Sequence, residues 1–399
     1  MAATQEQLCL ECAQAATTQR ARLLVLGLWR QRALGQRGLL RLLREDPDQV
    51  YAELPRRAAI EATLSGRARV AWAACFARPL AAWLEEGMEA LREHQALGAR
   101  LVCRGDAEYP PLLEAADGPA VLALQGALQT LRSPMVAVVG TRQPTRQARE
   151  LTQRLCHELV GCGLSLCSGG ALGIDALAHR AALRVQGRCV VVSATGLDQS
   201  YPRANTDIFD EAKVRGALLS QFPLRSNPRG EQFVRRNPTI AGLCSLTIVG
   251  QAPLRSGALY TARAALALGR PVMVVATAGF EPQSAGGLLL VRRKEAELLC
   301  ESSQVFTRMQ VPAKRSESSM PESERIPPES EPGEDLAVGR TGRGLAIVRR
   351  LQNGSARFDE LVESLGEEPA LLRTTLLELE LEGLVQQHPG EHYSLSVEL

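Results

Sequence analysis

The sequence predicts an α/β fold: a doubly wound parallel sheet, with a helical module before it and a winged-helix domain after it. Three observations lead to this prediction. In the middle of the chain, short β-branched runs alternate with helical stretches, which is typical of a parallel sheet covered by helices on both faces. The region before it is rich in Ala, Leu and Arg, with apolar residues three and four positions apart. The C-terminal region shows three helical patterns followed by a hairpin pattern.

Length and composition are those of an ordinary globular protein. The chain has 399 residues, enough for two to three domains, and its 45% of hydrophobic residues allows a sizeable core. The formal net charge is only +2, so the chain as a whole is not a polycation. A nucleic-acid surface would therefore depend on local clusters of arginine, such as those in residues 20–44 and 225–236.

The cysteines and the apolar runs bear on location. Most of the ten cysteines stand in apolar runs, which is typical of reduced, buried thiols in a cytoplasmic protein. Cys9 and Cys12 form a CxxC, but no second pair or histidine follows at zinc-ligand spacing, so helix packing is the better interpretation. The early apolar stretch at residues 23–29 is too short for a membrane span. We therefore expect no metal, no membrane span and a cytoplasmic location.

Residues 1–85 are predicted to form the N-terminal helical module. Its arginine-rich face fits either a solvated helix surface or a nucleic-acid contact, and the sequence leaves both open. Residues 86–310 are predicted to form a Rossmann-like domain. Its expected strands are residues 135–139, 164–167, 189–193, 217–220, 246–249 and 272–275, with helices at 146–160 and 174–186.

Residues 311–343 are predicted to be a disordered linker. The stretch is rich in Pro, Ser and Glu and has almost no large apolar residues, so it cannot bury enough surface to offset its ordering entropy. Residues 344–399 become regular again. Three helical patterns and a hairpin around Pro389-Gly390 predict a winged-helix domain.

Glycine-rich turns follow the first two predicted strands. Gly140, Thr141 and Arg142 come directly after the strand at 135–139, and in a doubly wound sheet ligands bind beyond the carboxyl ends of the strands. Glycine permits close backbone approach, while the hydroxyl and the guanidinium are good phosphate partners. The next strand runs into Ser168, Gly169, Gly170 and Gly173, a loop that opens a helix and whose N–H groups could hold a phosphate. Asp175 is expected to cap or orient this loop.

Further turns carry the same kinds of group. They include Arg235, Arg236 and Asn237, taken as a turn at a strand end or helix start, and Ser256-Gly257. Each turn alone fits ordinary loop chemistry, but a row of amides, hydroxyls and guanidiniums along one sheet edge predicts a groove that follows a phosphate backbone. Neither a P-loop nor a GxGxxG pattern is present, so no nucleotide cofactor is expected.

In this order the motifs resemble those of the DNA-processing protein A family (DprA/Smf). They are GTR at 140–142, SGGALGIDALAH at 168–179, GLDQSYPRAN at 196–205, FVRRNPTIAGL at 233–243 and SGALYTA at 256–262. The resemblance covers about residues 90–300, and more weakly 345–399. It implies a protein that binds single-stranded DNA, loads the RecA recombinase on it in natural transformation, forms homodimers and has no catalytic activity. The implied DNA-binding residues are Gly140, Thr141, Arg142, Ser168, Gly169, Gly170, Gly173, Arg235, Arg236, Asn237, Ser256 and Gly257.

Several positions depart from the family pattern. Pro238 stands where an Arg is expected after Asn237, at a predicted loop-to-helix junction. Gln221 and Gln251 stand where acidic residues are expected, and Gly287-Leu288 replaces a Thr-Asn pair. The missing Arg weakens phosphate binding, and the missing acidic charges partly offset that loss.

Two other functions remain as alternatives. A nucleoside-monophosphate phosphoribohydrolase would share the sheet, but it needs a PGG-x-GT-x-x-E loop, and this chain has AGFE at 278–281 and GGL at 286–288 instead. A winged-helix DNA-binding regulator would need a basic third helix, whereas this one carries Arg373 together with Glu378 and Glu380. A protein contact suits that helix better than duplex DNA.

Overall fold

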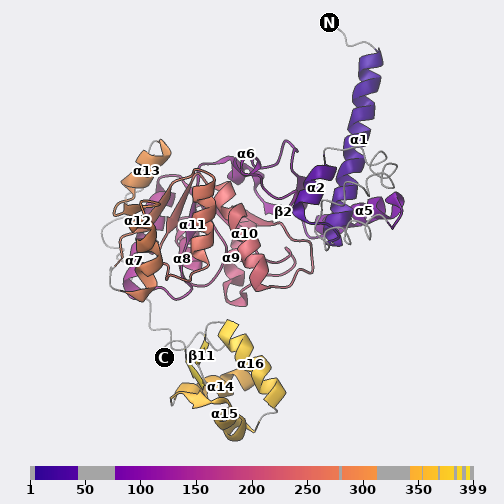
Figure 1. Cartoon of the computed structure of the whole chain (residues 1–399). Helices are drawn as coiled ribbons and strands as arrows, with labels where there is room; N and C mark the ends of the chain where they lie inside the picture. The colour runs from indigo at the N-terminus through magenta and orange to yellow at the C-terminus, as the bar shows by residue number, and fades with distance from the viewer. Residues whose placement is uncertain are drawn as a thin grey trace. The chain divides into compact units, whose positions relative to one another are not determined.

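The structure is a computed structural model, and it describes residues 5–43, 77–277, 281–311, 342–352, 354–366, 369–381, 384–388 and 392–395 (Figure 1). The chain divides into two compact units, residues 1–316 and 317–399. The linker predicted at 311–343 lies, apart from its ends, outside the described residues. The bounds of the four segments drawn from the sequence remain predictions.

A nine-stranded sheet forms the centre of the first unit, in the order β1-β2-β6-β5-β4-β3-β7-β8-β9. Seven strands run parallel, and their bounds are Met135–Val139 (β3), Ser165–Ser168 (β4), Cys189–Ser193 (β5), Ala217–Ser220 (β6), Leu246–Val249 (β7), Val272–Val275 (β8) and Glu297–Leu299 (β9). At one end of the sheet, Arg100–Cys103 (β1) pairs antiparallel with Val121–Gly126 (β2), and β2 pairs antiparallel with β6; the sequence did not predict these two strands. The chain winds outward from β3 to β6 and then returns to β7 on the other side of β3. The strand order therefore reverses between β3 and β7, where such sheets bind ligands.

Helices cover both faces of this sheet (Figure 1). Residues of β3 alternate between two separate cores: Val136 and Val138 pack on one face, and Met135, Ala137 and Val139 on the other. The strands are therefore buried on both sides, which explains their continuous apolar runs. The helices that follow β1 in this unit are Pro111–Ala115 (α6), Arg146–Gly161 (α7), Ile174–Arg184 (α8), Thr206–Arg215 (α9), Gly230–Leu243 (α10), Ala258–Ala267 (α11), Ala285–Arg292 (α12) and Ser303–Met309 (α13).

The N-terminal helices are Gln5–Arg30 (α1), Gln36–Leu42 (α2) and Leu80–Ala96 (α5). Helices α1 and α5 pack closely because glycines lie at the crossing. A Cβ on Gly27 would come within 2.2 Å of the Trp83 carbonyl oxygen, and one on Gly87 within 2.1 Å of the Leu23 carbonyl oxygen. The predicted helical character is confirmed for the described residues of this module, and residues 44–76 lie outside them.

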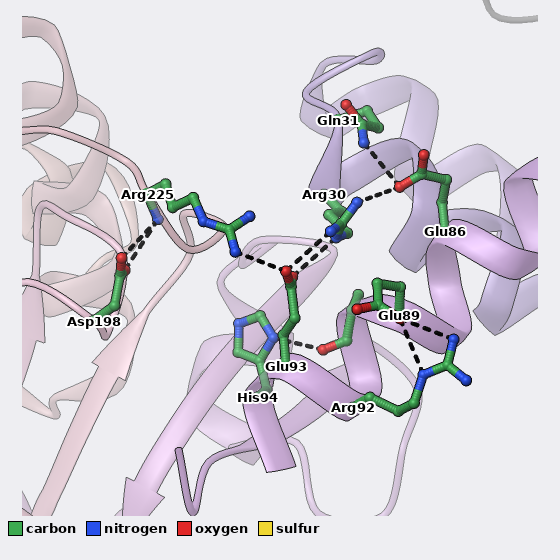
Figure 2. Close-up of polar contacts among 10 residues, drawn as sticks. Arg30, Gln31, Glu86, Glu89, Arg92, Glu93, His94, Asp198 and Arg225 are labelled. Atoms are coloured by element: carbon green, nitrogen blue, oxygen red, sulfur yellow. Dashed lines mark hydrogen bonds and ion pairs between the residues drawn. The ribbon is translucent and has the colours of Figure 1, made fainter. Parts of the chain in front are cut away.

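An ion-pair cluster fastens this module to the sheet domain (Figure 2). Glu93 of α5 accepts hydrogen bonds from Arg30 of α1 and, at 3.0 Å, from Arg225 in the β6–α10 loop. The main-chain N–H of Arg225 in turn donates to Asp198. Nearby, the Trp29 indole N–H donates to the Gln221 carbonyl oxygen at 2.9 Å. The N-terminal module thus holds the loop that leads into α10.

The second unit confirms the predicted winged helix. Its helices are Gly342–Gln352 (α14), Phe358–Leu365 (α15) and Pro369–Leu381 (α16), followed by strands Val385–His388 (β11) and His392–Leu395 (β12). A two-residue strand, Ala356–Arg357 (β10), completes the sheet. The predicted hairpin turn, Pro389-Gly390, lies outside the described residues. Among the helices that the structure describes, none has the length and apolar character needed to cross a membrane.

Candidate functional site

A pocket of about 310 Å³ opens where the strand order reverses. Residues beyond the carboxyl ends of β3, β4 and β7 line it, together with one side of α10 and the start of α11. The lining residues are Val139, Gly140, Thr141, Arg142, Ala171, Asp175, Phe233, Arg236, Asn237, Ile240, Pro253, Ser256, Gly257, Ala258 and Thr261. The topology therefore brings segments far apart in the sequence to one site.

The turn after β3 supplies an exposed cation. Gly140 is needed there because a Cβ would come within 2.4 Å of the Ile174 side chain. The Thr141 N–H donates to the Gln251 carbonyl oxygen at 2.7 Å, which fixes the turn. The exposed Arg142 guanidinium lies 5.5 Å from the centre of the Phe233 ring. Within the described residues no carboxylate pairs with Arg142, so its charge is available at the pocket.

Buried side chains fix the loop after β4. The Asp175 carboxylate accepts hydrogen bonds from the N–H groups of Gly169 (3.2 Å) and Ala171 (3.4 Å), which confirms that it orients this loop. The buried Ser168 hydroxyl donates to the Val138 carbonyl oxygen at 2.6 Å. Burial raises the pKa of the Asp175 carboxyl, and the Arg236 guanidinium opposes that shift. The Ser168 hydroxyl and the N–H groups of Gly169 and Ala171 therefore already have partners within the protein.

Arg236 forms the floor of the pocket rather than part of a turn. The sequence analysis placed it in a turn, but it lies inside α10 and is 3% exposed. Its guanidinium donates to the carbonyl oxygens of Gly169 (2.8 Å) and Val192. Burial lowers the pKa of Arg236 to about 10, and Asp175 acts in the opposite direction. At neutral pH the floor of the pocket is therefore still cationic.

Helix α10 also corrects the expectation for Pro238. That residue was predicted at a loop-to-helix junction, whereas α10 begins at Gly230 and runs through Pro238 to Leu243. The Asn237 side chain beside it donates to the Gly257 carbonyl oxygen at 3.2 Å and joins α10 to the start of α11. The two helices thus meet at the pocket.

Seven of the twelve predicted DNA-binding residues line the pocket: Gly140, Thr141, Arg142, Arg236, Asn237, Ser256 and Gly257. The other five, Ser168, Gly169, Gly170, Gly173 and Arg235, do not line it. Sequence reasoning did not single out Phe233, although it opens the motif at 233–243. Its ring lies near the guanidiniums of Arg142 and Arg236 and 5.8 Å from the Tyr201 ring, edge to face.

This arrangement suits binding of an anion beside an aromatic ring. Two guanidiniums, the Thr141 and Ser256 side chains and an exposed glycine surround the pocket, and its one carboxylate, Asp175, accepts main-chain N–H groups. In the described part of the chain no three His, Cys, Asp or Glu side chains are grouped to hold a metal. The AGFE segment at 278–281 was considered above for the phosphoribohydrolase alternative. Its carboxylate, Glu281, does not line the pocket, and residues 278–280 lie outside the described residues.

Two family models match this chain, and proteins of known sequence and structure are similar to it. The family described as DNA recombination-mediator protein A matches residues 100–310, and the DprA winged helix domain matches residues 331–391. Protein Smf of Synechocystis is 32% identical over 331 residues, covering 76% of this chain and 82% of Smf. Protein Smf of Escherichia coli is 33% identical over 289 residues, covering 72% and 75%. The X-ray structure of DNA processing protein A from Streptococcus pneumoniae is 32% identical, with a TM-score of 0.52, covering 58% of this chain and 82% of that one.

Proposed function

The chain belongs to the DNA recombination-mediator protein A family, and on that premise we propose that its pocket binds single-stranded DNA for recombination. The observation that carries the proposal is the exposed Arg142 guanidinium, which pairs with no carboxylate among the described residues and lies beside the Phe233 ring, over a floor made by Arg236. A guanidinium is a strong phosphate partner, and an aromatic ring can stack an unpaired base.

The size of the pocket favours single strands. About 310 Å³ is at the low end for a small-ligand site, which is far too small for a duplex. Bases reach an aromatic ring in such a pocket only when they are splayed out of a helix. We expect little sequence dependence, because the polar groups around the pocket suit a phosphate better than base edges.

The finer function is also a proposal. On the family resemblance, the protein would load the RecA recombinase onto the bound strand during natural transformation, and it would do so as a homodimer. Of the twelve predicted residues, the seven that line the pocket would contact the DNA. On the same resemblance the role would be binding rather than catalysis, which fits a pocket whose lining carboxylate, Asp175, accepts main-chain N–H groups.

A titration of labelled oligonucleotides tests the proposal. Single-stranded homopolymers should bind more tightly than duplexes of the same length, and the logarithm of the association constant should fall linearly with that of the salt concentration. Equal affinity for duplex, or no dependence on salt, would refute it.

A variant at Arg142 tests the site itself. Arg142→Ala should weaken single-strand binding by about 1–3 kcal/mol, the scale of a charged hydrogen bond, with little change in melting temperature. Arg146→Ala is the matched control, because Arg146 is exposed nearby but already pairs with Glu150 at 2.9 Å. If both variants bind alike, Arg142 is not a DNA contact.

A further inference from the structure

A buried glutamine holds the turn that carries Arg142. Gln251 lies just beyond β7 and is 1% exposed. Its side-chain oxygen accepts from the Thr145 N–H at 2.9 Å, and its main-chain oxygen accepts from the Thr141 N–H at 2.7 Å. One residue thus fixes both ends of the segment from Thr141 to Thr145, with Arg142 between them.

The Gln251 amide nitrogen has partners as well. It donates to the Glu281 carboxylate at 3.0 Å, to the Ser284 hydroxyl at 3.1 Å and to the Thr145 hydroxyl at 3.2 Å. The side chain therefore accepts on one atom and donates on the other. A carboxylate can only accept, and at this position it would face Glu281.

A second glutamine holds the helix that carries the rest of the site. Gln221 follows β6 and is 5% exposed. Its side-chain oxygen accepts from the Thr239 hydroxyl, and its nitrogen donates to the Arg235 carbonyl oxygen at 3.2 Å. Both partners belong to α10, which brings Phe233, Arg236 and Asn237 to the pocket. A carboxylate here would face a carbonyl oxygen.

We propose that Gln251 and Gln221 are positioning residues of the DNA site, and that each must be an amide while its present partners are kept, because it donates to one and accepts from another. Gln251 acts through Arg142, and Gln221 acts through α10. The inference rests on the proposed function, because its effect appears in DNA affinity. It adds two residues that do not line the pocket.

The first test exchanges the Gln251 and Glu281 side chains. Gln251→Glu places two carboxylates face to face in a buried setting, so single-strand affinity should fall about tenfold. The double variant Gln251→Glu/Glu281→Gln restores a donor opposite an acceptor, and affinity should return to within about twofold of the starting protein. Failure of the double variant to recover would overturn the proposal for Gln251.

The second test separates positioning from charge. Gln251→Met removes the side-chain hydrogen bonds without adding charge, and it should also weaken binding. In an Arg142→Ala background, neither Gln251 variant should weaken binding further, because the residue acts through Arg142. If only Gln251→Glu weakens binding, or if the losses add in the Arg142→Ala background, then Gln251 does not position Arg142.

For the second glutamine, Gln221→Glu should weaken binding, and the loss should be less than additive with Asn237→Ala on the same helix. Gln304→Glu is the matched control for both sites. Gln304 is also a bridging amide, which accepts from the N–H groups of Cys300 and Glu301 and donates to the Leu298 carbonyl oxygen, but it does not line the pocket. Its variant should bind as the starting protein does.

The reference variant Arg142→Ala distinguishes two kinds of failure. If Arg142→Ala weakens binding and the glutamine variants do not, the positioning role is wrong and the DNA site stands. If Arg142→Ala has no effect, the proposed site itself is wrong, and the inference falls with it.

Discussion

Two arginines that were both predicted to contact DNA lie in opposite environments. Arg142 is exposed and has an aromatic ring as its neighbour, whereas Arg236 is buried and donates to main-chain carbonyl oxygens. An exposed guanidinium can exchange its bound water for a phosphate. A buried one mainly sets the electrostatic potential and the shape of the pocket floor. Substitution of Arg236 should therefore affect folding, because it would remove the hydrogen bonds that its guanidinium donates to two buried carbonyl oxygens.

Pro238 offers a test of charge at the pocket. A proline has no N–H and disturbs a helix interior, at a cost of about 3 kcal/mol relative to alanine in an isolated helix. It lies inside α10, is exposed and follows Asn237, which lines the pocket. Pro238→Ala should therefore raise the melting temperature. Pro238→Arg should do so too and tighten single-strand binding up to about tenfold, since it adds a cation.

The comparison between the two variants is decisive here. Both restore the helix N–H, and only Pro238→Arg adds charge. Dissociation constants at one fixed salt concentration should differ between them. If the Arg and Ala variants bind alike, the side chain at position 238 faces away from the DNA.

At the scale of elements, strands with continuous β-branched runs were predicted with the correct bounds, as at Cys189–Ser193 and Val272–Val275. Strands β1 and β2 were missed. The Val121–Gly126 segment, VLALQG, is rich in Leu and Ala and carries no strand-specific period. Its antiparallel pairing with β6 depends on tertiary contacts that no local pattern reveals.

The candidate site was predicted in part for similar reasons. Residues just after strands, such as Gly140 and Arg142, follow from the rule that ligands bind at strand ends. Residues on helix faces, such as Phe233 and Thr261, depend on how α10 and α11 pack. The proline in RRNPT was taken as a helix boundary, yet packing carries α10 through it. The bond from Trp29 to Gln221 joins residues 192 positions apart, which sequence alone does not show.

The ion-pair cluster between α1, α5 and the β6–α10 loop should make stability depend on pH. Hydrogen bonds from Arg30 hold the pKa of Glu93 below its ordinary value of 4.5. A carboxyl with a lowered folded-state pKa stabilises the fold above its unfolded pKa, and this contribution is lost as pH falls through the folded value. Glu93→Gln should therefore destabilise the protein at pH 7 by about 1–3 kcal/mol, and by much less at pH values well below 4.5.

Denaturant unfolding followed by tryptophan fluorescence can measure this effect. The three tryptophans of the chain all precede residue 84, so the signal reports on the N-terminal module. Glu89→Gln is the control, because Glu89 pairs with the exposed Arg92 on the same helix, apart from the cluster (Figure 2). A difference between Glu93→Gln and the starting protein that stays constant from pH 7 to pH 3 would contradict the role of the Glu93 carboxylate.

At the scale of the whole molecule, the two compact units have separate cores. Ile347, Leu361 and Leu376 belong to a cluster in the second unit that shares no residue with the two clusters around the large sheet. Every residue that lines the pocket lies between Val139 and Thr261, inside the first unit. Each unit therefore contains the apolar contacts that an independent domain needs.

The last prediction follows from this division. Limited proteolysis should cut first within residues 311–343, whose Pro, Ser and Glu content gives no packable face, and it should release a stable fragment near residues 1–310. Mass spectrometry of the products locates the cuts. Because the fragment keeps the whole pocket and both sheet cores, it should bind a short single-stranded oligonucleotide with the dissociation constant of the full chain. Protection of residues 311–343 would argue against independent domains. A fragment that is folded but binds several-fold more weakly would place part of the DNA site on the winged helix, because the pocket residues themselves would be unchanged.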